Sequence, residues 1–123
     1  MPGYVHYDFG DAIRTVTNTA AEDEKNLSLI KMDIELFREY ARGYLSETGK
    51  TLNQVEKEYL AFAPKLITYT IGIRFLTDYI DGDNYFKIHH EFHNLQRTRA
   101  QLKLVMSMEE QYGEMQKIIS KLT

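Results

Sequence analysis

The sequence contains no cysteine and only two prolines among its 123 residues. The missing cysteines exclude disulfide bonds, a thiolate nucleophile and a cysteine-ligated zinc site, and they fit a reducing compartment. No apolar run reaches the roughly 18 residues that a membrane-spanning helix requires, and the first residues lack the basic-then-apolar pattern of a secretory signal. We therefore expect a cytoplasmic protein that has no membrane partner.

A surplus of charge of one sign is also missing, because 15 basic and 18 acidic residues are spread along the chain and give a net charge of −3. A nucleic-acid surface needs a basic patch, and the sequence has no basic block. It also lacks a glycine-rich phosphate loop, a nucleophile elbow and a dinucleotide-binding fingerprint. We expect no nucleic-acid partner.

What the sequence does contain is a helical pattern over most of its length. Hydrophobic residues make up 43% of the chain, which is enough for one packed core, and residues 1–123 are predicted to form a single domain. Met1-Pro2-Gly3 is typical of a turn. A short helix is expected over residues 8–17 with Asp8 as its N-cap, followed by a polar loop over residues 17–26.

Two further helices are expected in the first half of the chain. One covers about residues 34–46, with Asp33 as its N-cap and Gly49 in a left-handed cap after its end. The next begins at Thr51, where Gln54 three residues later completes a capping box.

The second half begins with Pro64, which is expected to end or kink the preceding helix because proline lacks a backbone donor. Residues 66–80 are ambiguous, since apolar residues alternate there with the period of a strand. The length of this segment and the absence of a partner strand favour a buried helix. After a turn at residues 81–84, a long helix is predicted over about residues 90–122, loosened or divided at Gly113. The predicted fold class is mainly α, a helical bundle.

Two short motifs suggest chemistry but are better explained by structure. Asp8-Phe9-Gly10 has the letters of the magnesium-binding triplet of protein kinases, yet the other kinase motifs are missing, and a helix cap followed by a buried aromatic is the favoured interpretation. His89, His90 and His93 fail the zinc-protease spacing, so a solvated histidine cluster is favoured over a metal site.

A third group is more specific. Arg74 and Asp78 lie four residues apart in a strongly apolar segment, where charges are rarely buried unless they are paired. A structural Arg74–Asp78 ion pair is one interpretation. The other is the wall of a cleft, in which Arg74 donates hydrogen bonds to a ligand and Tyr85 supplies a ring face or a hydroxyl.

Several longer segments resemble the aminoglycoside-phosphotransferase-like kinases, specifically the N-acetylhexosamine 1-kinase group. The matching segments are Met1–Arg14, Asn18–Glu24, Gly72–Tyr79 and His93–Val105. Some relatives carry a mucin-desulfating label, but the sequence has neither a cysteine nor the Ser-x-Pro-x-Arg motif of a sulfatase.

The resemblance implies that the chain is the C-terminal, substrate-binding subdomain of a longer two-lobed sugar kinase. In that family the magnesium-binding Asp, the catalytic Asp and the ATP lobe precede the segment matched here, so the chain is expected to contain no catalytic, metal-binding or cofactor-binding residues. ATP and magnesium would belong to the full-length enzyme, and the chain alone is expected to be inactive. The family's sugar pocket maps onto Arg74 and Tyr85, with Asp78 supporting Arg74 or facing the pocket, whereas Asp8, Asp11 and Arg14 would brace the active site.

An alternative function is a non-catalytic helical module that self-associates. A piece separated from its lobe would expose apolar surface, and such patches drive association. The candidates for this face are Tyr4, Val5, Tyr7 and Phe9, and the expected partner is a second copy of the chain.

Overall fold

A computed structural model describes residues 2–22, 24–48 and 52–122, with side chains described from Asp8 onward except for Thr48. Within these residues the fold is helical and contains no β-strand, which confirms the predicted mainly α class. In chain order the elements are α1 (Pro2–Val16), the 3₁₀ turn η1 (Leu27–Leu29), α2 (Ile34–Thr48), α3 (Gln54–Tyr59), α4 (Ala63–Ile80), α5 (His93–Glu110) and α6 (Tyr112–Leu122).

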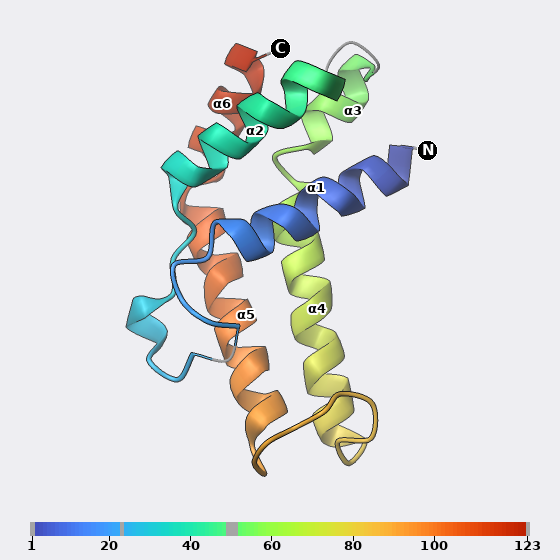
Figure 1. Cartoon of the computed structure of the whole chain (residues 1–123), viewed down its shortest axis with the longest axis vertical. Coiled ribbons are helices and arrows are strands. Elements are labelled where there is room, and N and C mark those ends of the chain that lie inside the picture. Colours follow the sequence, from blue (N-terminus) through green and yellow to red (C-terminus); the bar gives the residue numbers. More distant parts are fainter. Residues whose placement is uncertain (1, 23, 49–51, 123) are drawn as a thin grey trace.

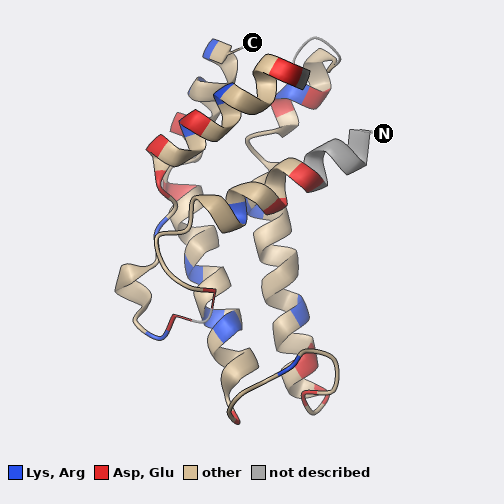
Figure 2. Ribbon diagram, viewed as in Figure 1, with Lys and Arg blue, Asp and Glu red and all other residues tan. Residues whose placement is uncertain are grey.

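The helices form two groups. The two longest, α4 and α5, run antiparallel side by side and make the most extensive contact in the molecule (Figure 1). At the other end, α2 packs on α6, and α3 also contacts α6. Helix α1 lies between the groups and crosses α4 near its first turn. Basic and acidic residues are mixed over most helices, and α4 carries few of either (Figure 2).

An aromatic cluster joins α1 to α2 at the centre of the core. Phe9 has no exposed surface, and its ring lies 6.1 Å from the ring of Phe37, 5.9 Å from that of Tyr40 and 5.1 Å from that of Tyr44. Rings at these separations attract each other beyond the gain from burial alone. Phe37, Tyr40 and Tyr44, which are three and four residues apart, therefore share the face of α2 that meets the core.

The crossing of α1 over α4 depends on Gly10. A Cβ atom at this position would lie 2.8 Å from the carbonyl oxygen of Ala63 and 2.8 Å from Cγ1 of Ile67. Both distances are well inside van der Waals contact, so only glycine lets the two helices approach this closely.

The polar loop predicted at residues 17–26 extends to residue 33 and is tied at both ends. Asn18 and Met32 form an antiparallel bridge, and Asp33 N donates to Thr17 O at 2.8 Å. Helix α5 holds the returning arm, because Met32 N donates to the hydroxyl of Ser107 at 2.9 Å and Gln111 Nε2 donates to Met32 O at 2.8 Å. The backbone N–H and carbonyl of the buried Met32 are thereby satisfied by side chains from the end of α5 and the residue that caps it.

Two predictions for the N-terminus are wrong. The chain does not begin with a turn, because α1 starts at Pro2, and Asp8 is inside α1 instead of capping it. Proline is favoured at the first position of a helix, where its missing N–H has no partner to lose. Phe9 is buried, as the favoured interpretation of Asp8-Phe9-Gly10 predicts, and it therefore does not belong to the exposed face considered for self-association. The side chains of Tyr4, Val5 and Tyr7 lie outside the described residues.

Other helix boundaries also differ from the predictions, because the capping residue and the proline occupy other positions than expected. The capping box of α3 is formed by Asn53 and Glu56 in place of Thr51 and Gln54, with Glu56 N donating to Asn53 Oδ1 at 2.8 Å. Gly49 and Thr51, to which caps were assigned, lie outside the described residues. Pro64 does not end a helix but occupies the first turn of α4.

The second half follows the predictions more closely. Residues 66–80 are helical despite their alternating pattern, as predicted. The long C-terminal helix is divided, although at Gln111 and not at Gly113.

Candidate functional site

The loop between α4 and α5, residues 81–92, is built around one buried carboxylate. Asp78, in the last turn of α4, is only 5% exposed. Its Oδ1 accepts the backbone N–H of Tyr85 at 2.7 Å, and its Oδ2 accepts the backbone N–H of Phe86 at 3.0 Å. A carboxylate placed this way fixes the returning arm of the loop against the end of α4.

The turn that brings the loop back requires left-handed backbone. Gly82 has a φ of 97° and Asp83 a φ of 62°, and glycine and aspartate are among the residues that adopt this region most readily. Asp83 N donates to the carbonyl of Asp78 at 2.7 Å, and Asn84 Nδ2 donates to the carbonyl of Asp81 at 2.8 Å. The predicted Asp-Gly-Asp-Asn turn thus closes the C-terminus of α4.

Helix α5 holds the same loop from the other side. The buried Asn94 donates through Nδ2 to Asp78 Oδ2 at 2.7 Å and to Asp83 Oδ1 at 3.0 Å. Arg97 donates to Asn94 Oδ1 at 2.9 Å and to the carbonyl of Lys87 at 3.0 Å. Asp78, Asn94 and Arg97 therefore form a chain of hydrogen bonds that joins α4, the loop and α5.

This arrangement lowers the pKa of Asp78. Burial by itself raises the pKa of the carboxyl, but the hydrogen bonds from the backbone of Phe86 and Tyr85, the side chain of Asn94 and the backbone of Asn84 more than offset burial. The net pKa is below the ordinary value, so Asp78 is a charged acceptor at neutral pH.

Arg74 lies one turn earlier on α4 and faces the aromatic rings of the loop. Its Cζ atom is 5.8 Å from the centroid of Tyr85 and 5.8 Å from that of Phe86, which is within cation–π range. Among the described residues no carboxylate lies within ion-pairing distance of its guanidinium. Its hydrogen-bond donors are therefore open to a ligand.

These residues surround a shallow hollow of about 340 Å³ on the surface. Its lining is formed by Arg74, Thr77, Asp78, Asp81, Tyr85 and Phe86. Tyr85 is 74% exposed, so one ring is largely accessible to solvent. The hollow combines an aromatic ring with donors and acceptors, which are the elements of a small-molecule site.

All three predicted site residues line this hollow, but their roles differ from some expectations. No Arg74–Asp78 ion pair forms, because the carboxylate of Asp78 is used by the backbone of Tyr85 and Phe86 and by Asn94. Asp78 therefore supports the loop that carries Tyr85 and does not support Arg74. Its place in the site is structural.

Sequence reasoning missed three residues that shape the site. Phe86 packs on Phe75 with 4.7 Å between ring centroids, and Asn94 and Arg97 anchor the loop as described above. Asn94 and Arg97 fall within the segment that resembles the kinases, but nothing in their spacing indicated contact with residues 78–87. A contact across 16 residues, such as that from Asn94 to Asp78, requires knowledge of the antiparallel pairing of α4 and α5.

The histidines cluster as expected, and His89 and His90 are exposed, but the third member is not solvated. His93 is buried, and its Nδ1 accepts the backbone N–H of His89 at 3.2 Å. The rings of His89 and His90 lie 5.4 Å and 4.7 Å from that of His93. Over the described part of the chain, no three His, Asp or Glu side chains gather closely enough to hold a metal ion.

Asp8-Phe9-Gly10 has a purely structural explanation. The motif lies in α1, with Phe9 in the aromatic core, Gly10 at the crossing with α4, and Asp8 exposed. Nearby, the mostly buried Arg14 pairs with Asp11 at 3.0 Å and with Glu22 at 2.8 Å. This group ties the end of α1 to the loop that follows it.

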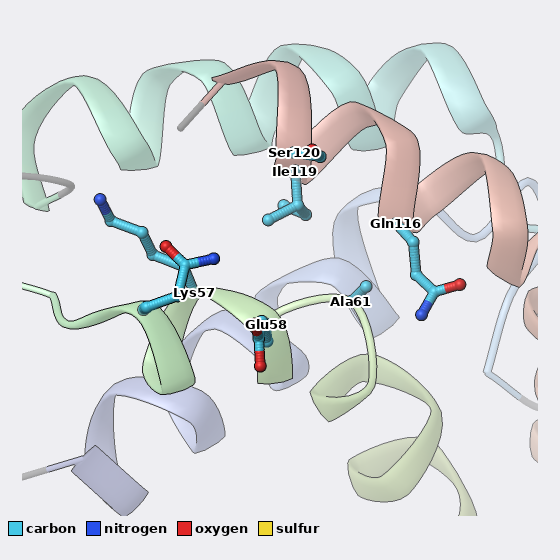
Figure 3. A pocket seen from close by; sticks show the side chains of 7 residues that line it. Lys57, Glu58, Ala61, Gln116, Ile119 and Ser120 are labelled. Carbon is cyan, nitrogen blue, oxygen red and sulfur yellow. The ribbon is translucent and has the colours of Figure 1, made fainter.

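A second hollow of about 220 Å³ lies between α3 and α6. Figure 3 shows Ile119 directed from α6 into the space between the helices, with Lys57 and Glu58 on α3 at its rim. None of the site residues predicted from the sequence lies here, and the lining includes no aromatic ring. The hollow at Arg74 is therefore the better candidate for a ligand site.

No model of a known protein family matches the chain. Over its described residues, no helix has both the length and the apolar character needed to cross a bilayer.

Proposed function

We propose that the chain is the sugar-binding helical part of an ATP-dependent phosphotransferase that acts on N-acetylhexosamine or a similar sugar. The observation that carries the proposal is that Arg74 and Tyr85 line one hollow, and that Asp78, in the same lining, holds the loop that carries Tyr85. Two arguments from the sequence select these residues: the charges set in an apolar segment, which suggest a cleft wall, and the kinase resemblance, which maps a sugar pocket onto them.

The chemistry of the hollow suits a hydroxylated ring. The accessible face of Tyr85 can receive the C–H face of a sugar, as aromatic side chains do in sites with a few placed polar groups. Arg74 offers a fork of N–H donors, and Asp81 offers an exposed carboxylate acceptor. Because the hollow combines one cation, Arg74, with one exposed anion, Asp81, it favours a neutral ligand that both donates and accepts hydrogen bonds.

The hollow is open, so the chain alone is expected to bind weakly. N-acetylglucosamine has about 15 non-hydrogen atoms, and about 0.3 kcal/mol per atom gives a binding free energy near −4.5 kcal/mol, or a Kd of about a millimolar. A site of this strength is within reach of an amide-NMR titration.

The test is a titration of the folded chain with N-acetylglucosamine. Saturable shifts at the amides of Arg74, Thr77 and Tyr85 are expected. Arg74→Gln and Tyr85→Ala should weaken binding at least several-fold, whereas Arg99→Gln, at an exposed arginine of α5, should leave it unchanged. A dispersed spectrum without saturable shifts would show that the chain does not bind this sugar, and the proposal would then be wrong.

A further inference from the structure

The outer face of α4 carries an apolar stripe that no other described part of the chain covers. Helix α4 packs on α5 and α1 with its buried residues, among them Thr68, Gly72 and Phe75. Beside this buried face, five apolar residues follow one another at spacings of three or four. We call this set the α4 seam: Leu66, Tyr69, Ile73, Leu76 and Ile80.

The seam is exposed and uncharged. Leu66 is 48% exposed, Tyr69 50% and Ile80 76%, whereas Ile73 and Leu76 are half-buried. The exposed residues between them, Thr70 and Thr77, carry no charge. Figure 2 shows how few charges α4 carries along its length. A solvent-facing helix surface is ordinarily charged, so this face has the composition of an interface.

The spacing of the seam indicates a helix as the partner. Residues that alternate at three and four positions form the a and d positions of a heptad repeat, which insert into the gaps of a facing helix. From Leu66 to Ile80 the seam rises about 21 Å at 1.5 Å per residue. That length suits pairing with a helix of four turns.

We propose that α4 pairs antiparallel with α4 of a second copy of this chain, around a twofold axis through the seam. A twofold interface brings the same patch of both copies together, so the patch must complement itself. Spacings that alternate between three and four residues are preserved when the chain direction is reversed, so the seams of two antiparallel copies can pack together. Because the seam is uncharged, the pairing places no like charges opposite each other. Arg74, the nearest cation without a carboxylate partner, is directed at the rings of Tyr85 and Phe86.

The area is sufficient for a weak dimer. With aromatic side chains at about 150–250 Å² each and aliphatic ones somewhat smaller, the exposed parts of the seam and its two threonines amount to roughly 500 Å² per copy. Two copies would bury about 1,000 Å², which is the lower limit for a specific interface. The dimer is therefore expected to form reversibly over the micromolar range. Its interface shares Thr77 with the hollow at Arg74, but the proposal does not rest on the proposed sugar binding.

The test is sedimentation velocity of the whole chain over a concentration series. The wild-type mass should rise from 14.4 kDa toward twice that value. Tyr69→Glu and Ile80→Glu, both at exposed positions, should each shift the dimer dissociation constant upward at least tenfold. The matched control is Met106→Glu on α5, which is 52% exposed and adds the same charge away from the seam. Circular dichroism establishes that each variant is folded.

Introduced cysteines give a second measurement, because the natural chain has none. A spin label at Thr70→Cys should show dipolar broadening that strengthens as the dimer forms, and one at Met106→Cys should not. A wild-type chain that stays monomeric would overturn the proposal. So would a dimer that survives both seam substitutions, or one that Met106→Glu weakens equally, because the interface would then lie elsewhere or reflect charge alone.

Discussion

Replacing Gly10 by alanine is expected to destabilise the fold, although alanine is the better helix former. The added Cβ would lie 2.8 Å from Ala63 O, 3.0 Å from Ala63 C and 2.8 Å from Cγ1 of Ile67. The side chain of Ile67 can rotate, but the backbone of Ala63 belongs to the first turn of α4. Relief therefore requires α1 and α4 to move apart by several tenths of an ångström.

Two effects of opposite sign decide the magnitude. Overpacking of this kind costs about 1–3 kcal/mol, while exchanging glycine for alanine inside a helix gains up to about 1 kcal/mol. Gly43 provides a matched control, because it lies inside α2 and a Cβ there would have no atom within 4 Å. Gly43→Ala is thus expected to stabilise the chain, and the difference between the two variants isolates the cost of the helix crossing.

Thermal and urea unfolding of both variants measure this difference. We expect Gly10→Ala to be less stable than Gly43→Ala by about 1–3 kcal/mol, which corresponds to roughly 4–12 °C in Tm for a chain of this size. Equal stability of the two variants would refute the reasoning, because it would mean that α1 and α4 do not approach each other closely at residue 10.

Four further predictions follow from named contacts and motifs. Because the pKa of Asp78 is lower in the folded chain than in the unfolded one, its carboxylate stabilises the fold above about pH 4, and this contribution is lost on acidification. The free energy of unfolding, measured as a function of pH, should therefore decrease less steeply below about pH 4 in Asp78→Asn than in wild type. Ser107→Ala removes the acceptor of the Met32 N–H and should cost about 1–3 kcal/mol in urea unfolding, and a neutral effect would show that the loop is not held there. Asn53→Ala removes one half of the capping box with Glu56 and should cost about 1 kcal/mol, with faster amide exchange in α3 as its local signature. The chain mixed with MgATP and N-acetylglucosamine should form no sugar phosphate by phosphorus NMR, since its sequence lacks the motifs that position phosphates; accumulation of a sugar 1-phosphate would contradict this prediction.

The helices could be predicted because their apolar periodicity agrees with the packing they adopt. Helix α2 is a direct example, since Phe37, Tyr40 and Tyr44 recur at spacings of three and four and reach the core ring of Phe9. Residues 66–80 were harder, because β-branched residues favour a strand locally and burial between α5 and α1 decided for a helix. The local propensity for a strand conflicted there with the packing of the segment against other helices, and the length of the segment was the better guide.

The helix ends were less predictable because single residues support opposite interpretations. A proline can end one helix or begin the next, and the choice depends on whether an acceptor is available for the missing N–H. Both prolines of this chain, Pro2 and Pro64, begin helices. The shift of the capping box from Thr51 to Asn53 has the same origin, since either residue type can cap a helix and only the backbone angles select one.

The candidate site shows where sequence information ends. Arg74 and Tyr85 could be selected from the sequence, but the role of Asp78 depends on how residues 81–92 fold back. With a left-handed turn at Gly82 and Asp83, the N–H groups of Tyr85 and Phe86 reach the carboxylate, and Asp78 becomes an acceptor for backbone in place of a partner for Arg74. As a direct consequence, no carboxylate among the described residues pairs with the guanidinium of Arg74. The open guanidinium that makes the hollow a candidate binding site thus depends on the fold of this loop. Asn94 on α5, sixteen residues after Asp78, holds the loop in place through its hydrogen bond to Asp78.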